Sequence, residues 1–180
     1  MQLEEFYDYK NQLMGDILTN KDIVSLLNSD IKFEDATKLA YTQVFPCEYI
    51  PDTVEHGKTF ICFDVDIQEA SANKTFLYPV LYIWVFTHRS KLRLPNGGGV
   101  RTDKLCVEIA KAINGSRKYG LGELELYAVK RFAPMTDFNG KLMTFHAKDF
   151  NTIRRNRLLL IVRQDNVSIT SALSRFLCNQ

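Results

Sequence analysis

The chain has 180 residues, of which 46% are hydrophobic and 24% charged, and its formal net charge is +2. These values are typical of one globular domain with an appendage and exclude wholesale disorder. The charge is too small to indicate nucleic-acid binding by itself, and no apolar run approaches the roughly 20 residues that span a bilayer. Residues 1–5 are acidic, unlike a secretory signal, so we expect a soluble protein made in the cytoplasm with no membrane partner.

The first forty residues carry three helical patterns. Apolar residues at helical spacing predict an amphipathic helix over residues 2–18. Asn20 is placed to cap a shorter helix over residues 22–27. Residues 33–40 predict a third helical segment, which ends before Pro46 because a proline restricts the residue ahead of it.

A long β-hairpin is the central feature of the pattern. After an irregular lead-in, residues 57–67 alternate between apolar and polar side chains, as a half-buried strand does. A polar turn separates them from residues 75–88, a second strand that is apolar or aromatic on both faces. Pro79 donates no hydrogen bond, which places it at a sheet edge or a bulge. We expect helices to cover one face and a neighbouring subunit to contact the other. The candidate interface residues on that second face are Tyr78, Tyr82, Trp84 and Phe86.

A basic loop with a glycine run follows the hairpin. Gly97, Gly98 and Gly99 mark a mobile or sharply turning segment. Glycines before a helix can present N–H groups to a phosphate. However, neither Gly-x-x-x-x-Gly-Lys-[Ser/Thr] nor Gly-x-Gly-x-x-Gly is present, which argues against a nucleotide.

The second half of the chain pairs two more strands after one helix. Thr102 is placed to cap a helix over residues 102–113. Strands are predicted over residues 123–132 and 141–148, joined by a turn at residues 137–140. The order is N-terminal helices and then β-β-α-β-β. It predicts an α+β fold with a mainly antiparallel sheet of two β-hairpins and a crossover helix.

The last thirty residues differ from the rest. We divide the chain into a single α+β core domain with N-terminal helices over residues 1–151 and a C-terminal extension over residues 152–180. The extension is basic and then apolar, and residues 158–162 could form a strand, with a short helix over residues 168–177. The basic cluster supplies the candidate DNA-facing residues, which are Arg154, Arg155 and Arg157.

Residues capable of catalysis or metal binding are scattered. The four cysteines and three histidines have no metal-ligand spacing, so buried thiols and structural histidines are the favoured interpretation. Asp64 and Asp66 share one face of a strand and could bind a divalent cation, but a solvated or interface-facing edge is favoured. No local motif of nucleophilic or hydrolytic catalysis is present. We therefore expect no cofactor, no metal and no enzymatic activity.

Six stretches carry a resemblance to a known family and span approximately residues 20–151. They are VFPCEYIPDTVE (44–55), FICFDVD (60–66), IWVFTH (83–88), GGVRTDKL (98–105), NGSR (114–117) and DFN (149–151). Together they resemble small neck proteins of tailed bacteriophages, and more narrowly those of the tail terminator or tail-completion type. None of these motifs is catalytic, so the resemblance lies in the general pattern.

The resemblance implies a small α+β domain with a long β-hairpin, which agrees with the order of elements above. It also implies a structural virion protein, assembled in the host cytoplasm, that forms a homo-oligomeric ring of six subunits. Such a ring ends tail-tube growth, contacts the tail tube protein and the head connector, and surrounds the passing double-stranded DNA. We expect the glycine loop, through Arg93 or Arg101, to order upon contact with the tube or connector.

Three alternatives stay open at this point. A head-completion or connector adaptor protein of the same neck could carry the same kind of core. A nucleic-acid-binding module could grip DNA without reading its sequence, through the basic loop and the Arg154 to Arg157 cluster. A small enzyme would need a deep pocket that collects His88, His146 or the two aspartates.

Overall fold

The computed structural model describes residues 5–28, 31–50, 57–73 and 75–151. It contains three α-helices in these ranges, α1 (Glu5–Thr19), α2 (Lys21–Leu27) and α3 (Arg101–Ile113). Three 3-10 segments accompany them: η1 (Phe33–Leu39), η2 (Arg89–Lys91) and η3 (Pro95–Gly97). The strands are β1 (Val44–Phe45), β2 (Thr59–Ala70), β3 (Phe76–His88), β4 (Glu125–Phe132), β5 (Phe138–His146) and β6 (Asp149–Phe150).

One six-stranded sheet organises the fold. Its strand order is β1-β2-β3-β5-β4, and β6 pairs with β3 beyond the end of β5. The β2–β3 and β4–β5 hairpins are antiparallel, and only the short β1 runs parallel to its neighbour β2. The α+β fold of two hairpins and a crossover helix is thus confirmed, with β1 and β6 added to it.

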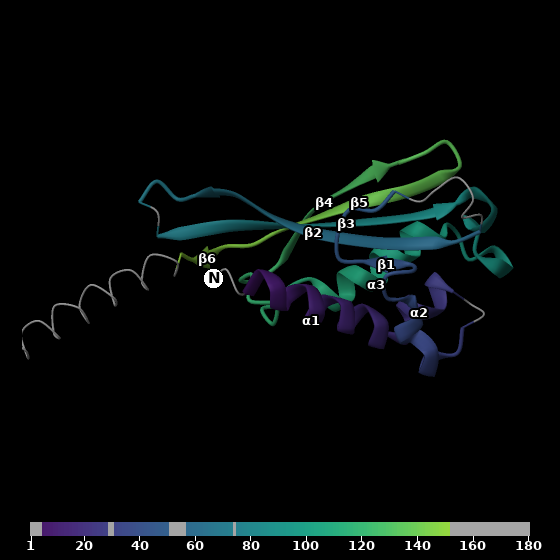
Figure 1. Ribbon diagram of the computed structural model, residues 1–180. Helices are drawn as coiled ribbons and strands as arrows, with labels where there is room; N and C mark the ends of the chain where they lie inside the picture. Colours follow the sequence, from purple (N-terminus) through teal and green to yellow (C-terminus); the bar gives the residue numbers. More distant parts are fainter. Residues whose placement is uncertain (1–4, 29–30, 51–56, 74, 152–180) are drawn as a thin grey trace, which may run out of the picture.

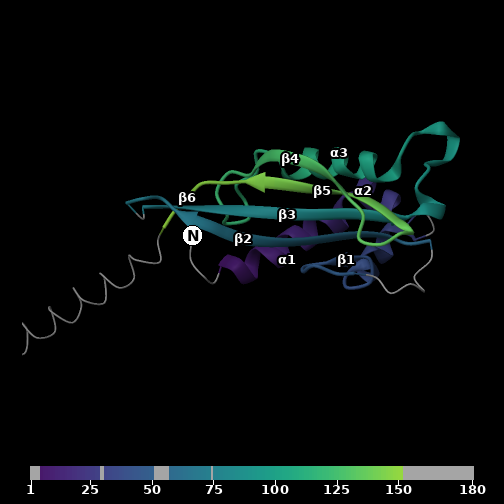
Figure 2. The same ribbon diagram turned by 90° about the horizontal axis from the view of Figure 1, so that it is seen from above.

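The helices lie together on one side of this sheet (Figure 1). Seen from above, the strands run nearly along the long axis of the molecule, with α3 and α1 beneath different parts of the sheet (Figure 2). The core between the layers includes Tyr9 and Ile17 of α1, Ile109 of α3, Phe63 of β2 and Phe145 of β5. Each of these side chains is at most 1% exposed, and burial of one large apolar side chain contributes about 2–3 kcal/mol.

Local signals explain most element boundaries. The Asn20 side chain accepts hydrogen bonds from the N–H groups of Asp22 (3.0 Å) and Ile23 (3.2 Å), so the predicted N-cap of α2 is confirmed. Asn114 ends α3, and Gly115 follows with φ 76°. Pro79 lies beside the register shift of β2 between Ile67 and Ala70, as expected for a residue without an N–H donor.

Two boundary predictions were wrong. Helix α3 begins at Arg101 after Val100, and Thr102 is a buried residue inside its first turn instead of the N-cap. The turn of the second hairpin precedes Phe138, and Gly140 lies within β5 opposite Phe86. A Cβ at Gly140 would approach Val85 O to 2.3 Å, so the glycine provides space for β3 and does not form a turn.

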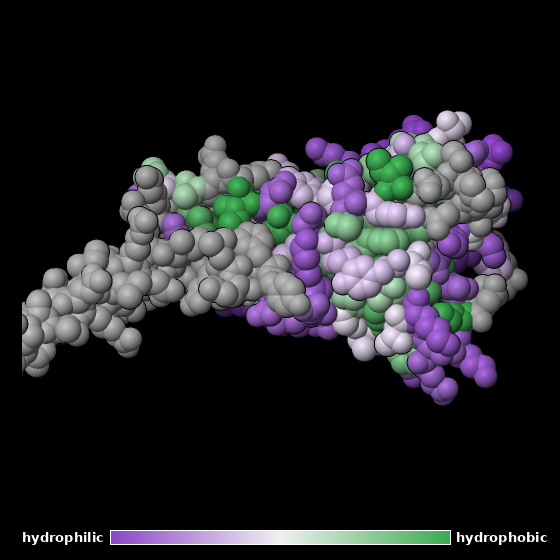
Figure 3. All heavy atoms as spheres, in the orientation of Figure 1, coloured by the Kyte–Doolittle hydropathy of each residue, from purple (hydrophilic) through white to green (hydrophobic). Residues whose placement is uncertain are grey.

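The C-terminal extension, with its predicted strand and helix, lies outside the described residues, so the division at residue 151 stays a prediction. Among the described residues, no helix has the length and apolar character needed to cross a bilayer. In the orientation of Figure 1, hydrophilic and hydrophobic residues are interspersed over the described surface (Figure 3).

Candidate interaction surfaces

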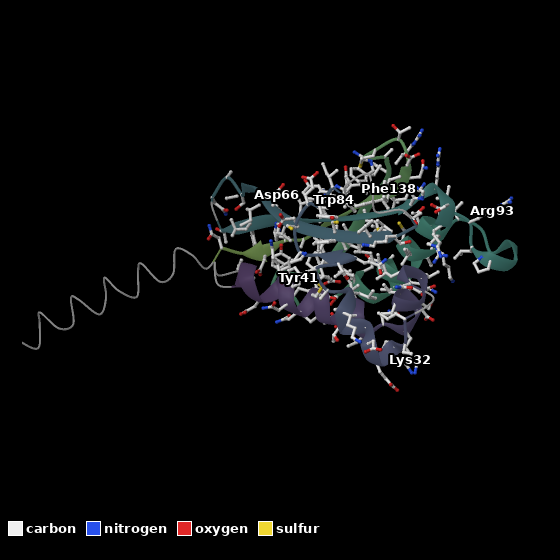
Figure 4. The ribbon with its side chains drawn as sticks, turned by 45° about the vertical axis from the view of Figure 1, so that its right-hand side comes forward. Lys32, Tyr41, Asp66, Trp84, Arg93 and Phe138 are labelled. Atoms are coloured by element: carbon white, nitrogen blue, oxygen red, sulfur yellow. The ribbon has the colours of Figure 1, made fainter. Side chains whose placement is uncertain are left out.

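The face of the sheet turned away from the helices, called the open face below, carries the predicted aromatic residues. Tyr78 is 38% exposed, and Tyr82 and Trp84 are half-buried. The rings of Tyr82 and Trp84 stack with centroids 5.9 Å apart. Three of the four predicted aromatic residues therefore reach the surface on one face, and Figure 4 shows Trp84 there.

Phe86 differs from this expectation because it is fully buried. Its ring lies 5.3 Å from that of Phe60, and 5.9 Å from each of the rings of Phe132 and Phe138. Phe132 and Phe138 come from the β4–β5 hairpin, which folds over this end of the open face. The chain itself thus covers the Phe86 end of the aromatic face, and Phe86 belongs to a second small core.

A shallow acidic hollow adjoins the exposed aromatic pair. It encloses about 290 Å³, and its lining consists of Glu48, Asp64, Asp66, Tyr82, Trp84 and Leu142. Asp64 accepts a hydrogen bond from Tyr9 Oη (3.2 Å) and pairs with Lys10 Nζ (3.2 Å). Burial, together with the nearby Asp64 charge, raises the pKa of Tyr9 well above its usual range. Asp66 is exposed at the rim, where Figure 4 shows it.

The glycine loop forms a compact protrusion. Arg93 and Val100 form an isolated antiparallel bridge, and Leu94 N–H donates to Gly99 O (3.0 Å). Gly97 and Gly99 adopt φ 72° and 90°, which favour glycine, so the predicted sharp turns are present. Arg93 is exposed at the far end of the molecule, away from Trp84 and Asp66 (Figure 4).

Arg101 holds the base of this loop in place. It is only 7% exposed, and its guanidinium donates to Lys91 O (2.8 Å) and Leu26 O (2.5 Å). Burial lowers the pKa of Arg101 from its ordinary value, although an arginine keeps its charge at any physiological pH. Arg101 therefore joins the loop to the end of α2, and its side chain is buried at this junction.

Three other described cations have a local carboxylate. Arg89 pairs with Asp137 (3.2 Å), Lys118 pairs with Asp16 (2.6 Å), and Arg117 pairs with Glu123. These pairs reduce the positive charge available to a phosphate backbone. Arg154, Arg155 and Arg157 lie outside the described residues.

Strand β4 is a surface that sequence patterns missed. It is the last strand of the sheet, and most of its side chains are exposed on both faces. Tyr127 is 71% and Val129 47% exposed, and Lys130 and Arg131 are exposed beside them. The two adjacent cations were the available signal, since edge strands often carry lysine. Periodicity alone does not show which strand lies at an edge.

Groups that could hold a cofactor or carry out catalysis lie apart from one another in the structure. Within the described ranges, no three His, Cys, Asp or Glu side chains are placed to bind one metal ion. His88 Nδ1 is 2.8 Å from Ser90 Oγ, and the His146 ring stacks on Tyr127. Burial raises the pKa of the Cys62 and Cys106 thiols to about 12, which keeps them protonated and unreactive at neutral pH.

A larger open cavity of about 630 Å³ lies between the start of β4 and β6. Arg117 and Glu123, which line it, pair with each other. His146 also lines this cavity, and its ring stacks on that of Tyr127.

These features define a class of protein: a small α+β domain with helices on one face of its sheet, whose predicted site residues lie mainly on exposed sheet and loop surfaces. The model of the YomW family matches residues 20–147, and the chain belongs to that family. No curated protein matches the chain.

A solved structure has the same fold. It is a chain from "Virion of native gene transfer agent (GTA) particle", with 14% sequence identity and a TM-score of 0.53. The match covers 83% of the present chain and 100% of that chain. At this identity the similarity establishes the fold.

Proposed function

We propose that this chain is a structural protein of a virion or virus-like particle and has no enzymatic activity. More narrowly, it forms a ring at the neck that ends the tail tube and joins the tail to the head connector. One observation carries the proposal: the fold matches the whole length of a chain from a gene transfer agent virion. The resemblance of residues 20–151 to tail terminators supports the narrower position.

The shape and surfaces of the subunit are suited to ring assembly. A closed ring needs two different contact faces on each subunit, because its contacts are head-to-tail. The sheet ends at two different edges, the exposed β4 and the partly covered β2. The Arg93 loop protrudes from one end of the long axis, where it can meet a ring above or below (Figure 4).

The proposed partners are five further copies of the chain, the tail tube protein, the head connector or head-completion protein, and DNA passing through the lumen. Electron microscopy of the purified protein mixed with tail tubes of the parent particle tests this assignment. We expect rings on one end of each tube, and we expect the tubes that carry them to stop elongating. Rings that bind only connectors would support the head-completion alternative.

Absence of binding to tubes and to connectors would overturn the neck assignment. The next measurement would then be DNA binding at graded salt concentrations. A non-specific nucleic-acid module would lose affinity steeply as the salt concentration rises, because phosphate contacts release counterions.

A further inference from the structure

The β4 strand ends the sheet with main-chain groups directed outward. Ile61 N–H donates to Gln43 O on the β1 side, and His88 N–H donates to Lys58 O between β2 and β3. Along each strand, successive residues direct their main-chain N–H and C=O groups to opposite sides. These two bonds and the observed registers of β3 and β5 therefore determine the side to which each residue of β4 directs its groups. It follows that Ala128 and Lys130 direct their main-chain groups toward β5. Val129 and Arg131 direct theirs away from the sheet.

No hydrogen-bond partner for the outward main-chain groups of Val129 and Arg131 exists among the described residues. At the start of β4, by contrast, Asn114 Oδ1 accepts from Leu126 N–H (2.7 Å) and covers the edge. The uncovered stretch is thus residues 127–132. An uncovered edge with exposed apolar side chains is a site where another strand can add.

The two edges of the sheet have opposite charge. Lys130 and Arg131 are exposed on β4, and no ion pair joins either of them to another described residue. At the β2 edge, Asp66 and Glu48 are exposed at the acidic hollow. They too form no ion pair with a described residue. The basic edge of one copy therefore complements the acidic edge of another.

The apolar side chains and the strand directions also agree with this pairing. Val129 lies on the helix-side face of β4, opposite Met143, and Val65 and Ile67 lie on the same face of β2. Strands β2 and β5 run one way, and β3 and β4 run the other. Rotation about an axis close to the strand direction preserves these directions. Lys130 is level with Cys62 in its own sheet, so the strands must tilt from that axis for Lys130 to reach the Asp66 end of the next copy's β2. The β2 strand of the next copy would then run antiparallel to β4, continuing the alternation.

We propose that a second copy of this chain docks on the β4 edge. Lys130, on the open face of β4, then lies beside Asp66 and Glu48 of that copy, and Arg131 adds positive charge from the helix-side face of the same edge. The contact rests on the proposed ring and specifies its interface. On β2, the N–H of Val65 already donates to Asp64 Oδ1 (2.9 Å) and is not available to a strand of the neighbouring copy. At that position the contact is therefore made by side chains. Main-chain pairing begins beyond it, toward Ile67.

A charge-reversal experiment tests the pairing. One variant carries Lys130→Glu and Arg131→Glu, and the other carries Asp66→Lys and Glu48→Lys. Each variant alone should need a protein concentration about tenfold higher or more for assembly, because like charges then meet at every contact. Their equimolar mixture should assemble again into an alternating ring with an even number of subunits. Light scattering measures the mass of the assembled species in all three samples, the two variants and their mixture.

Matched controls separate charge from position. Arg93→Glu reverses an exposed arginine of the glycine loop, which belongs to neither sheet edge, and should leave assembly unchanged. Val129→Pro removes an outward N–H without removing a bond to β5, so the fold should persist while assembly is lost. Val129→Thr keeps the N–H and should still assemble. Thermal unfolding of each variant shows that the fold is retained.

The outcomes distinguish the two proposals. If the wild type forms rings but the charge reversals and Val129→Pro leave them intact, this interface is wrong and the proposed function stands. If Arg93→Glu alone abolishes assembly, the glycine loop is the contact instead. If the wild type stays monomeric both alone and with tail tubes, the ring itself is refuted, and the interface with it.

Discussion

Replacement of Gly140 by alanine tests the packing of the two hairpins. The new Cβ would lie 2.3 Å from Val85 O, 2.6 Å from Phe86 Cβ and 2.8 Å from Phe86 Cα. Two of these atoms belong to the backbone of β3, which β2 and β5 hold from both sides. The strand cannot move aside cheaply, so the cost lies at the upper end of the usual range for overpacking, about 3 kcal/mol.

Urea unfolding followed by circular dichroism measures this free energy, and in a thermal scan the midpoint temperature should fall by about 6–12 °C. Gly97→Ala is the matched control. Its Cβ meets nothing within 4 Å, and only its φ of 72° is unfavourable, so it should cost about 1 kcal/mol. If Gly140→Ala costs no more than Gly97→Ala, the close approach of β5 to β3 is refuted.

Three further predictions concern stability. Arg101→Gln removes the guanidinium bonds to Leu26 O and Lys91 O and should cost about 3 kcal/mol in urea unfolding; a change below about 1 kcal/mol would contradict the anchoring role. Asn20→Ala removes the α2 cap and should cost about 1 kcal/mol, whereas Asn20→Ser should restore most of it. Stability should be fully present below about pH 8.5 and fall as the pH rises toward about 12, because burial raises the thiol pKa of Cys62 and Cys106 above the unfolded value. A urea midpoint that rises between about pH 8.5 and 10.5 would contradict that sign.

Most of the fold was predictable because its signals are local. Alternation identified both strands of the β2–β3 hairpin, and helical spacing identified α1 and α3. The Asn20 cap was visible in the sequence because capping needs one side chain at one position. Gly140 was misplaced because Asn-Gly favours a turn, whereas the need for a glycine there comes from Val85 and Phe86, distant in the sequence.

The candidate site was less predictable because its surfaces depend on tertiary structure. Phe86 and Trp84 are indistinguishable in the alternation, but Phe132 and Phe138 cover only the first of them. Arg101 was expected at a surface, and the end of α2 buries it. The β4 edge follows from strand order, which periodicity does not specify.

The mass of the purified wild-type protein across a concentration series, measured by light scattering behind a sizing column, tests the ring most directly. We expect a single closed oligomer of six subunits, or a monomer that becomes one when tail tubes are added. The mass of this oligomer should stop increasing with concentration, because a closed ring leaves no contact free. A monomer at every concentration that neither binds nor caps tubes would contradict it.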